Sequence, residues 1–340
     1  MLAAMPGLAF ALAACGDSSE EPAAAATGLP EIKKATFMAG FKAQANLPFV
    51  GAYVAKEKGF FAEQRLEVDI RHAQSGEHLQ LTLAGEVNVT TANGASVLKR
   101  NAQDLNLVSL ALIGQRSELA FAVLESSPIR SVKDWEGKTF GYKGSVPAEF
   151  PAITRANGVD PARINQVSVG FDPRILSEGR VDILPVFFSN EPGVLAAQGV
   201  RTRLFDPNDY GIESLGLTYA SSAEQVSKDP DRLLRFLRAA LYGIAYADRN
   251  RDEAIDIVMR YAPQEDRAHQ KFMLETELSR AKNDLTARNG IGWQTREQWQ
   301  RAHDILLEHR GIEKAVDVSK VFTDQFLRAI YRDGRLVWPG

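Results

Sequence analysis

The residue types that most often carry catalysis or bind metals are few in this chain. Its 340 residues contain one cysteine, Cys15, and five histidines. A single cysteine excludes a disulfide framework, a cysteine zinc site and an iron–sulfur cluster. His72 and His78 are too far apart for one helical turn, and the other histidines are His269, His303 and His309. Neither Gly-x-Ser-x-Gly nor a Walker phosphate loop occurs, so the sequence predicts no catalytic residue, no metal site and no cofactor.

The lone cysteine has the surroundings of a modification site. It closes Leu12-Ala13-Ala14-Cys15, after an apolar stretch that starts at Leu8. Small residues before a cysteine at the end of an N-terminal apolar segment resemble the lipobox of bacterial lipoproteins, in which the thiol receives a diacylglycerol. The apolar stretch is shorter than the ~20 residues that span a bilayer. We therefore expect residues 1–15 to be a signal peptide that ends at Cys15, and the mature chain to be held at the membrane by a lipid anchor.

The length of the chain indicates how many lobes it forms, and its charge indicates which partners can be excluded. The chain is 45% hydrophobic and longer than the ~250–300 residues at which single cores stop growing, which favours two lobes. The formal net charge of −3, with scattered Lys and Arg, gives no concentrated basic face, so no nucleic-acid partner is expected. Residues 16–30 have no core pattern and are typical of a flexible tether. The folded body is expected to begin at residue 31.

Strand and helix signals alternate along the body. Residues 66–70 alternate apolar and polar side chains, as in a half-buried strand, and Thr295 with Gln298 forms a capping-box pattern. The predicted strands are 66–70, 87–91, 105–110, 139–142, 166–169 and 181–186, and the predicted helices are 49–58, 77–85, 95–102, 229–248, 296–310 and 319–332. Alternating strands and helices favour a mostly parallel sheet.

Three segments resemble a family of ABC-transporter solute-binding lipoproteins. The segments are Tyr53–Phe61 with the strand that follows, Ser127–Thr139, and Gly179–Leu184. The family includes alkanesulfonate, nitrate, taurine and thiamine-pyrimidine binders. The resemblance implies an α/β type II periplasmic-binding-protein fold, with two α/β lobes, a hinge and a C-terminal helical segment. Lobe 1 would comprise 31–121 plus 221–340, and lobe 2 would comprise 122–220.

This layout places the ligand in the cleft between the lobes, on the loops at the carboxyl ends of strands. Phe41 offers a flat apolar face, whereas Gln44 and Asn46 can bond a ring edge or a hydroxyl. Glu191 can accept hydrogen bonds from ring N–H groups, and aminopyrimidine binders of the family place a carboxylate there. The full set of expected ligand-binding residues is Phe41, Lys42, Gln44, Asn46, Gln74, Asn93, Ser96, Tyr142, Ser145, Phe187, Phe188, Asn190, Glu191 and Tyr210.

The first loop, Gly40–Asn46, departs from the tryptophan-proline-asparagine-histidine loop of the thiamine-pyrimidine binders. Since aromatic residues recur in the other loops, we expect riboflavin or a related heterocycle, whose rings aromatic side chains can stack. A thiamine pyrimidine precursor and an alkanesulfonate-type solute remain alternatives.

The expected partners are the permease and ATPase subunits of an ABC importer, on the extracytoplasmic face of the cell membrane. An enzyme on the same fold, similar to yeast-type pyrimidine synthases, is the alternative class, but those enzymes use a cysteine-rich motif that this chain lacks. We therefore expect a binding protein and not an enzyme. An extracytoplasmic sensor module is a third class, and it would need a membrane-spanning helix.

Overall fold

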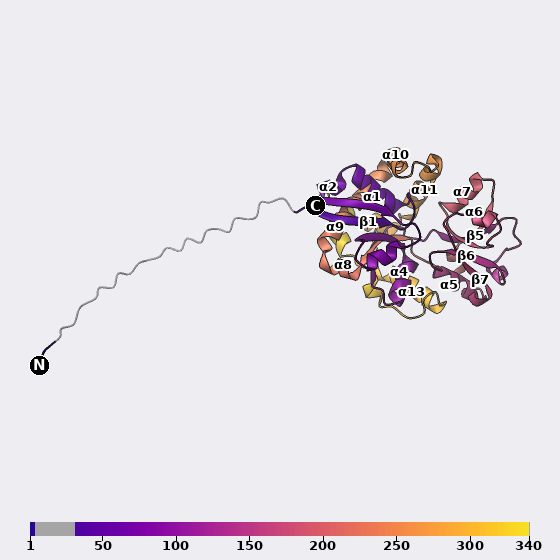
Figure 1. The fold of residues 1–340 in the computed structure, drawn as a ribbon, viewed down its shortest axis with the longest axis horizontal. Coiled ribbons are helices and arrows are strands. Elements are labelled where there is room, and N and C mark those ends of the chain that lie inside the picture. Colours follow the sequence, from indigo (N-terminus) through magenta and orange to yellow (C-terminus); the bar gives the residue numbers. More distant parts are fainter. Residues whose placement is uncertain (4–30, 340) are drawn as a thin grey trace. The chain divides into compact units, whose positions relative to one another are not determined.

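A computed structural model describes residues 1–3 and 31–339 (Figure 1). Residues Ile32–Gly340 form one compact unit. Cys15, the tether 16–30 and most of the predicted signal peptide lie outside the described residues. Among the residues that are described, no helix is long and apolar enough to cross a membrane.

The larger sheet has five strands in the order β2-β1-β3-β10-β4. Strands β1 (Lys33–Ala39), β2 (Leu66–His72) and β3 (Val89–Asn93) pair in parallel. Strand β10 (Leu217–Ser222) runs antiparallel to both β3 and β4 (Leu107–Leu112). Because β10 returns from the second sheet system and enters between β3 and β4, parallel pairing in this sheet is limited to β1 with β2 and β1 with β3.

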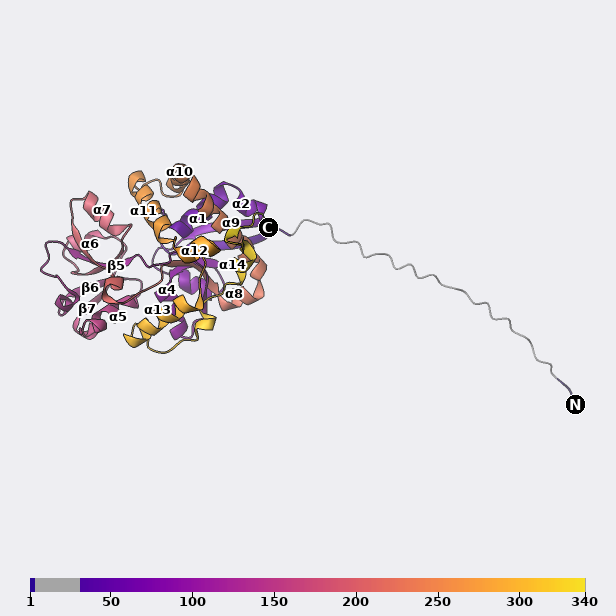
Figure 2. The same cartoon turned by 180° about the vertical axis from the view of Figure 1, so that it is seen from behind.

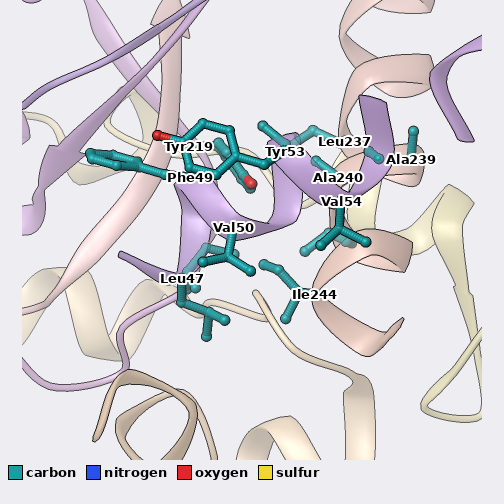
Figure 3. Packing of buried hydrophobic residues seen from close by; sticks show 14 of the residues in the cluster. Leu47, Phe49, Val50, Tyr53, Val54, Tyr219, Leu237, Ala239, Ala240 and Ile244 are labelled. Carbon is teal, nitrogen blue, oxygen red and sulfur yellow. The ribbon is translucent and has the colours of Figure 1, made fainter. Parts of the chain in front are cut away.

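Two helices pack closely against each other beside this sheet. Helix α1 (Leu47–Glu57) is buried along most of its length, and it crosses α9 (Pro230–Arg249) at Gly51. A Cβ on Gly51 would lie 2.7 Å from the Ala240 carbonyl oxygen. Figure 3 shows the aliphatic side chains around this crossing, with Val54 near Ala240 and Ile244. The absence of a Cβ therefore lets the two backbones approach closely.

The second sheet system starts at β5 (Leu119–Leu124), which pairs antiparallel with β8 (Leu184–Phe187) and β9 (Thr202–Phe205). Strands β6 (Thr139–Lys143) and β7 (Asn165–Val169) pair in parallel. Figures 1 and 2 show these strands at one end of the body, with helices α5 (Glu149–Ala156), α6 (Arg174–Ser177) and α7 (Glu191–Ala197) around them. The expectation of a mostly parallel sheet is wrong for β5, β8 and β9, because β5 pairs antiparallel with both of its neighbours.

The remaining elements complete the body. Helices α3 and α4 follow β2 and β3, and the others cover the first sheet or form the C-terminal segment. Their bounds are α2 Phe60–Glu63, α3 His78–Leu83, α4 Gly94–Ala102, α8 Ala223–Lys228, α10 Arg251–Tyr261, α11 Arg267–Arg280, α12 Asp284–Asn289, α13 Arg296–Glu308, α14 Gln325–Ile330, β11 Tyr331–Arg332 and β12 Arg335–Leu336.

The predicted helices 229–248 and 296–310 are confirmed as α9 and α13, and the Thr295 capping box is present. The predicted helix 319–332 is confirmed only for Gln325–Ile330, as α14. Ser109 in β4 accepts a backbone hydrogen bond from Thr323 and donates one to Val321, so this stretch is held extended against the sheet. The helix that follows, α14, is only six residues long before the chain turns into the β11–β12 hairpin.

Candidate ligand-binding cavity

A cavity of about 310 Å³ lies where loops from the two sheet systems meet. Its walls come from the segments after β1 and β3 on one side and after β6 and β8 on the other. The chain leaves these strands at their carboxyl ends, which is where open α/β sheets bind ligands. Its volume is at the lower end of the range for small-molecule sites.

Most of the predicted ligand-binding residues line this cavity. They come from the β1–α1 loop, the β3–α4 junction, the β6–α5 loop and the β8–α7 junction. The predicted residues in the wall are Phe41, Gln44, Asn46, Asn93, Ser96, Ser145, Phe187, Asn190 and Glu191.

Five predicted residues lie outside the wall, namely Lys42, Gln74, Tyr142, Phe188 and Tyr210. The Lys42 ammonium pairs with Glu265 at 2.5 Å, and the Phe188 ring lies 4.9 Å from the Arg280 guanidinium. Tyr210 packs near the Phe205 ring. These side chains are therefore engaged elsewhere in the fold.

One of these displacements, that of Tyr142, follows from the alternation of side chains along a strand. Tyr142 shares a face of β6 with Phe140, 6.5 Å away between ring centroids, and packs on the second core. The next residue, Lys143, lines the cavity instead. Gln74 is exposed, and its amide donates to the His72 carbonyl oxygen at 3.5 Å.

A chain of amides links the two halves of the wall. The Asn190 amide after β8 donates to Gln44 Oε1 at 3.3 Å, and Gln44 Nε2 donates to Asn46 Oδ1 at 2.6 Å. Asn46 in turn donates to the buried Glu277 carboxyl, which also accepts from the Leu47 backbone N–H at 2.5 Å. Burial raises the pKa of Glu277. The buried Glu277, which does not line the cavity, therefore holds the amide chain in position.

An ion pair occupies the opposite wall. The Lys143 ammonium bonds Glu191 Oε1, and the two side chains are 11% and 7% exposed. The other oxygen of Glu191 accepts from the Phe187 backbone N–H at 2.8 Å. Because Lys143 neutralises the carboxylate, Glu191 adds hydrogen-bonding capacity to the wall without adding net charge.

Aromatic side chains from the two halves meet at the cavity. Phe41, from the β1–α1 loop, lies edge to face with Phe171, from the β7–α6 loop, at 4.6 Å between ring centroids. Phe49 and Phe187 add further ring surface to the wall. A flat apolar ligand would find both ring faces and ring edges here.

Sequence reasoning missed several wall residues, chief among them His78, Lys99, Arg100 and Phe171. His78 was considered from the sequence only as a metal ligand, yet this side chain lines the wall, and burial lowers its pKa to about 4. Lys99 and Arg100 follow Ser96 by three and four residues, so they share one face of α4. That spacing was the available signal for these two residues.

No group of three or more His, Cys, Asp or Glu side chains in residues 1–3 and 31–339 could hold a metal ion. The cavity wall instead combines aromatic rings, amides, hydroxyls and cations. Such a wall can bind and orient a small polar aromatic molecule by stacking and hydrogen bonding.

Three known proteins illustrate what the chain is similar to. It is 28% identical to the riboflavin-binding protein RibY of Chloroflexus aurantiacus over 83% of each chain. It is 29% identical to a formylaminopyrimidine-binding protein of Halalkalibacterium halodurans over 80% of this chain and 84% of the relative. Its fold matches the alkanesulfonate-binding protein SsuA of Xanthomonas axonopodis pv. citri with a TM-score of 0.65 and 15% identity, over 87% of this chain and 99% of that one.

The family model described as NMT1/THI5 like matches residues 46–254. This span includes every strand that contributes to the cavity except β1. The chain therefore belongs to the NMT1/THI5-like family, and its fold is that of the periplasmic solute-binding proteins.

Proposed function

We propose that this protein is the solute-binding subunit of an ABC importer and that it captures a flat aromatic heterocycle, riboflavin in the first place. The observation that carries the proposal is the cavity between the two sheet systems, where the Phe41 and Phe171 rings meet beside a chain of amides. The similarity to a riboflavin-binding protein over most of both chains supports the choice of ligand. Titration with riboflavin, followed by flavin emission, tests it.

The amide chain and the ion pair suit such a ligand. Gln44, Asn46 and Asn190 offer donors and acceptors for the carbonyls and N–H group of an isoalloxazine edge or for the hydroxyls of a ribityl chain. Glu191, with Lys143 beside it, presents a second polar edge. Hydrogen bonds to a ring edge give selectivity, because a ligand that lacks the partner atoms leaves buried polar groups unpaired.

A thiamine pyrimidine precursor is the second candidate. The buried Glu191 favours it, because a carboxylate can accept hydrogen bonds from an aminopyrimidine. The similarity to a formylaminopyrimidine-binding protein adds support. Parallel titrations with an aminopyrimidine distinguish the two ligands, because only one of them should stabilise the protein at low concentration.

Capture would involve a hinge between lobe 1, residues 31–121 plus 221–340, and lobe 2, residues 122–220. Several contacts cross between these lobes: Gln44 to Asn190, Phe41 to Phe171, and the Lys99 ammonium to the Val146 carbonyl oxygen at 2.5 Å. Ligand contacts on both sides would favour this closed arrangement over an open one. The permease and its ATPase would distinguish the two forms.

The protein would act on the extracytoplasmic face of the cell membrane, anchored through a diacylglycerol on Cys15. The apolar stretch before Cys15 and the tether after it support this proposal. Metabolic labelling with a radioactive fatty acid tests it: the native chain should be labelled and a Cys15→Ser variant should not. An unlabelled native chain would overturn the anchor and leave the binding function untouched.

A further inference from the structure

One end of the cavity carries an unbalanced positive charge. Glu191 is the only carboxylate among the residues that line the cavity, whereas Lys99, Arg100 and Lys143 are all cations. Lys143 is paired with Glu191. Among the described residues, neither Lys99 nor Arg100 has a salt bridge, so two cations face the cavity without a counter-ion.

Helix α4 brings these cations together with a hydroxyl. Ser96, Lys99 and Arg100 are spaced i, i+3 and i+4, so they lie on one face of the helix, and all three line the cavity. The Lys99 ammonium reaches across to the Val146 carbonyl oxygen at 2.5 Å, which brings it to the loop that holds Ser145. Ser145 also lines the cavity, so hydroxyls from both sides approach the same end.

His78 lies beside this cluster. A Cβ on Gly40 would be 2.9 Å from His78 Nε2, so the imidazole packs against the Gly40 backbone. Its Nδ1 is buried and has no hydrogen-bond partner. Burial is the main cause of the low pKa of His78, and the neighbouring Arg100 lowers it further. The imidazole is therefore neutral near pH 7, with a ring nitrogen left unpaired in the wall.

Three carboxyl groups, those of Glu77, Glu149 and Glu313, act on Lys99 or His78 from outside the cavity wall. Glu149 is fully buried, accepts from the Ser214 hydroxyl at 2.9 Å, and has its pKa raised by burial. Glu77 is occupied by the backbone N–H groups of Gln74 and Ser75 at 2.9 and 2.8 Å. Neither side chain lines the cavity. Apart from Glu191, which pairs with Lys143, a counter-charge inside the cavity would therefore have to come from a bound molecule.

We infer that the cavity takes a ligand that carries a phosphate monoester as well as an aromatic ring, so that the phosphorylated flavin is preferred over riboflavin. This inference rests on the proposed function. A guanidinium offers a planar fork of donors and an ammonium a compact charge, and both are common phosphate ligands. With the hydroxyls of Ser96 and Ser145, the cluster has donors for all three terminal oxygens of a phosphate. Phe41 and Phe171 would hold the ring.

The test compares flavin mononucleotide with riboflavin on the full chain, by quenching of flavin emission. The two ligands share the same ring system, so their affinity ratio isolates the phosphate. We expect flavin mononucleotide to bind at least about tenfold more tightly, a margin that falls as salt screens the charges. In Arg100→Gln the ratio should drop to about threefold or less, because flavin mononucleotide loses more affinity than riboflavin does, and Arg100→Lys should restore part of it. Arg251→Gln, which removes an exposed arginine paired with Asp248, is the matched control and should keep the full ratio.

Equal affinity for the two flavins, or an equal loss for both in Arg100→Gln, would overturn the phosphate site while leaving flavin capture intact. If neither flavin binds, the proposed ligand is wrong, and the phosphate site is then decided by a hydroxymethyl-aminopyrimidine and its phosphate ester in a thermal-shift assay. Preferential stabilisation by the ester, lost in Arg100→Gln, would support the site. Equal effects of the two compounds would refute it.

Discussion

The rings of Phe41 and Phe171 lie edge to face, 4.6 Å between centroids, although they belong to different sheet systems. Phe41 follows β1 and Phe171 follows β7, and both line the cavity. This contact joins the two sides of the site through side chains that a ligand ring can also touch. In the proposed function, it would therefore connect closure of the protein with recognition of an aromatic ligand.

Truncation of either ring should weaken binding. In Phe171→Ala we expect the ligand affinity to fall by about tenfold or more, since a buried aromatic contact is worth on the order of 1–2 kcal/mol. Calorimetric titration of the variant measures the loss. Phe272→Ala, at a ring that is 53% exposed on α11, is the matched control. Unchanged affinity in Phe171→Ala would remove this ring from the site.

The buried pair of Lys143 and Glu191 allows a double-mutant cycle. Lys143→Met leaves a buried carboxylate unpaired, so the free energy of unfolding should fall by about 3 kcal/mol. Lys143→Met combined with Glu191→Gln should recover much of that loss. Urea denaturation measures all four proteins. Lys58→Met, at the more exposed pair with Glu253, should cost less than about 1 kcal/mol, and equal losses at both pairs would contradict this account.

The close crossing of α1 and α9 predicts that no side chain larger than that of glycine fits at Gly51 without a loss of stability. A methyl group there would lie 2.7 Å from the Ala240 carbonyl oxygen, so Gly51→Ala should lower the free energy of unfolding by about 1–3 kcal/mol. Gly170→Ala is the control, because a Cβ at Gly170 meets nothing within 4 Å. Denaturant unfolding of both variants checks the difference, and a neutral Gly51→Ala would argue against this close approach.

The raised pKa of Glu277 predicts that the stability of the protein depends on pH. Its pKa in the folded protein is raised by burial and by the nearby Glu118, so the folded state holds this proton more tightly than the unfolded state does. The contribution is fully present below the unfolded pKa of ~4.3 and is lost as pH rises through the folded pKa. The stability of the native protein relative to Glu277→Gln should therefore fall with rising pH, by up to about 1.4 kcal/mol per pH unit.

Unfolding in urea at pH values from 4 to 8 measures this difference. Glu275→Gln, at an exposed glutamate on the same helix, should track the native protein at every pH. If the stability of the native protein relative to Glu277→Gln rose with pH, or did not change, Glu277 would not be a carboxyl with a raised pKa.

Local patterns predicted much of the fold. Apolar periodicity located α9, and the Thr295 capping box located the start of α13. The first part of the predicted helix 319–332 is not helical, although its apolar residues have helical spacing. Backbone hydrogen bonds between Ser109 and the segment Val321–Thr323 hold this part against the sheet. Such pairing joins distant parts of the chain, so no local window contains it.

The sequence predicted which loops line the cavity, and this was enough to place Gln44 and Asn190 in its wall. Tyr142 was expected in the wall, but Lys143 lies there instead, because neighbouring residues of β6 point to opposite faces. Phe188 was also expected there, but it follows the end of β8 and its ring lies against Arg280. The face of α4 that meets the cavity, and the position of Phe171, depend on how the two sheet systems pack together.

The most direct measurement of the central claim is the titration of the full chain with riboflavin, followed by flavin emission and by thermal unfolding in parallel. We expect quenching that saturates at one flavin per chain, with a stabilisation of about 2.7 kcal/mol at a hundredfold excess over Kd. Phe171→Ala should weaken both signals. Unquenched flavin and an unchanged unfolding transition, in a protein that an aminopyrimidine stabilises, would contradict flavin capture and assign the cavity to the pyrimidine.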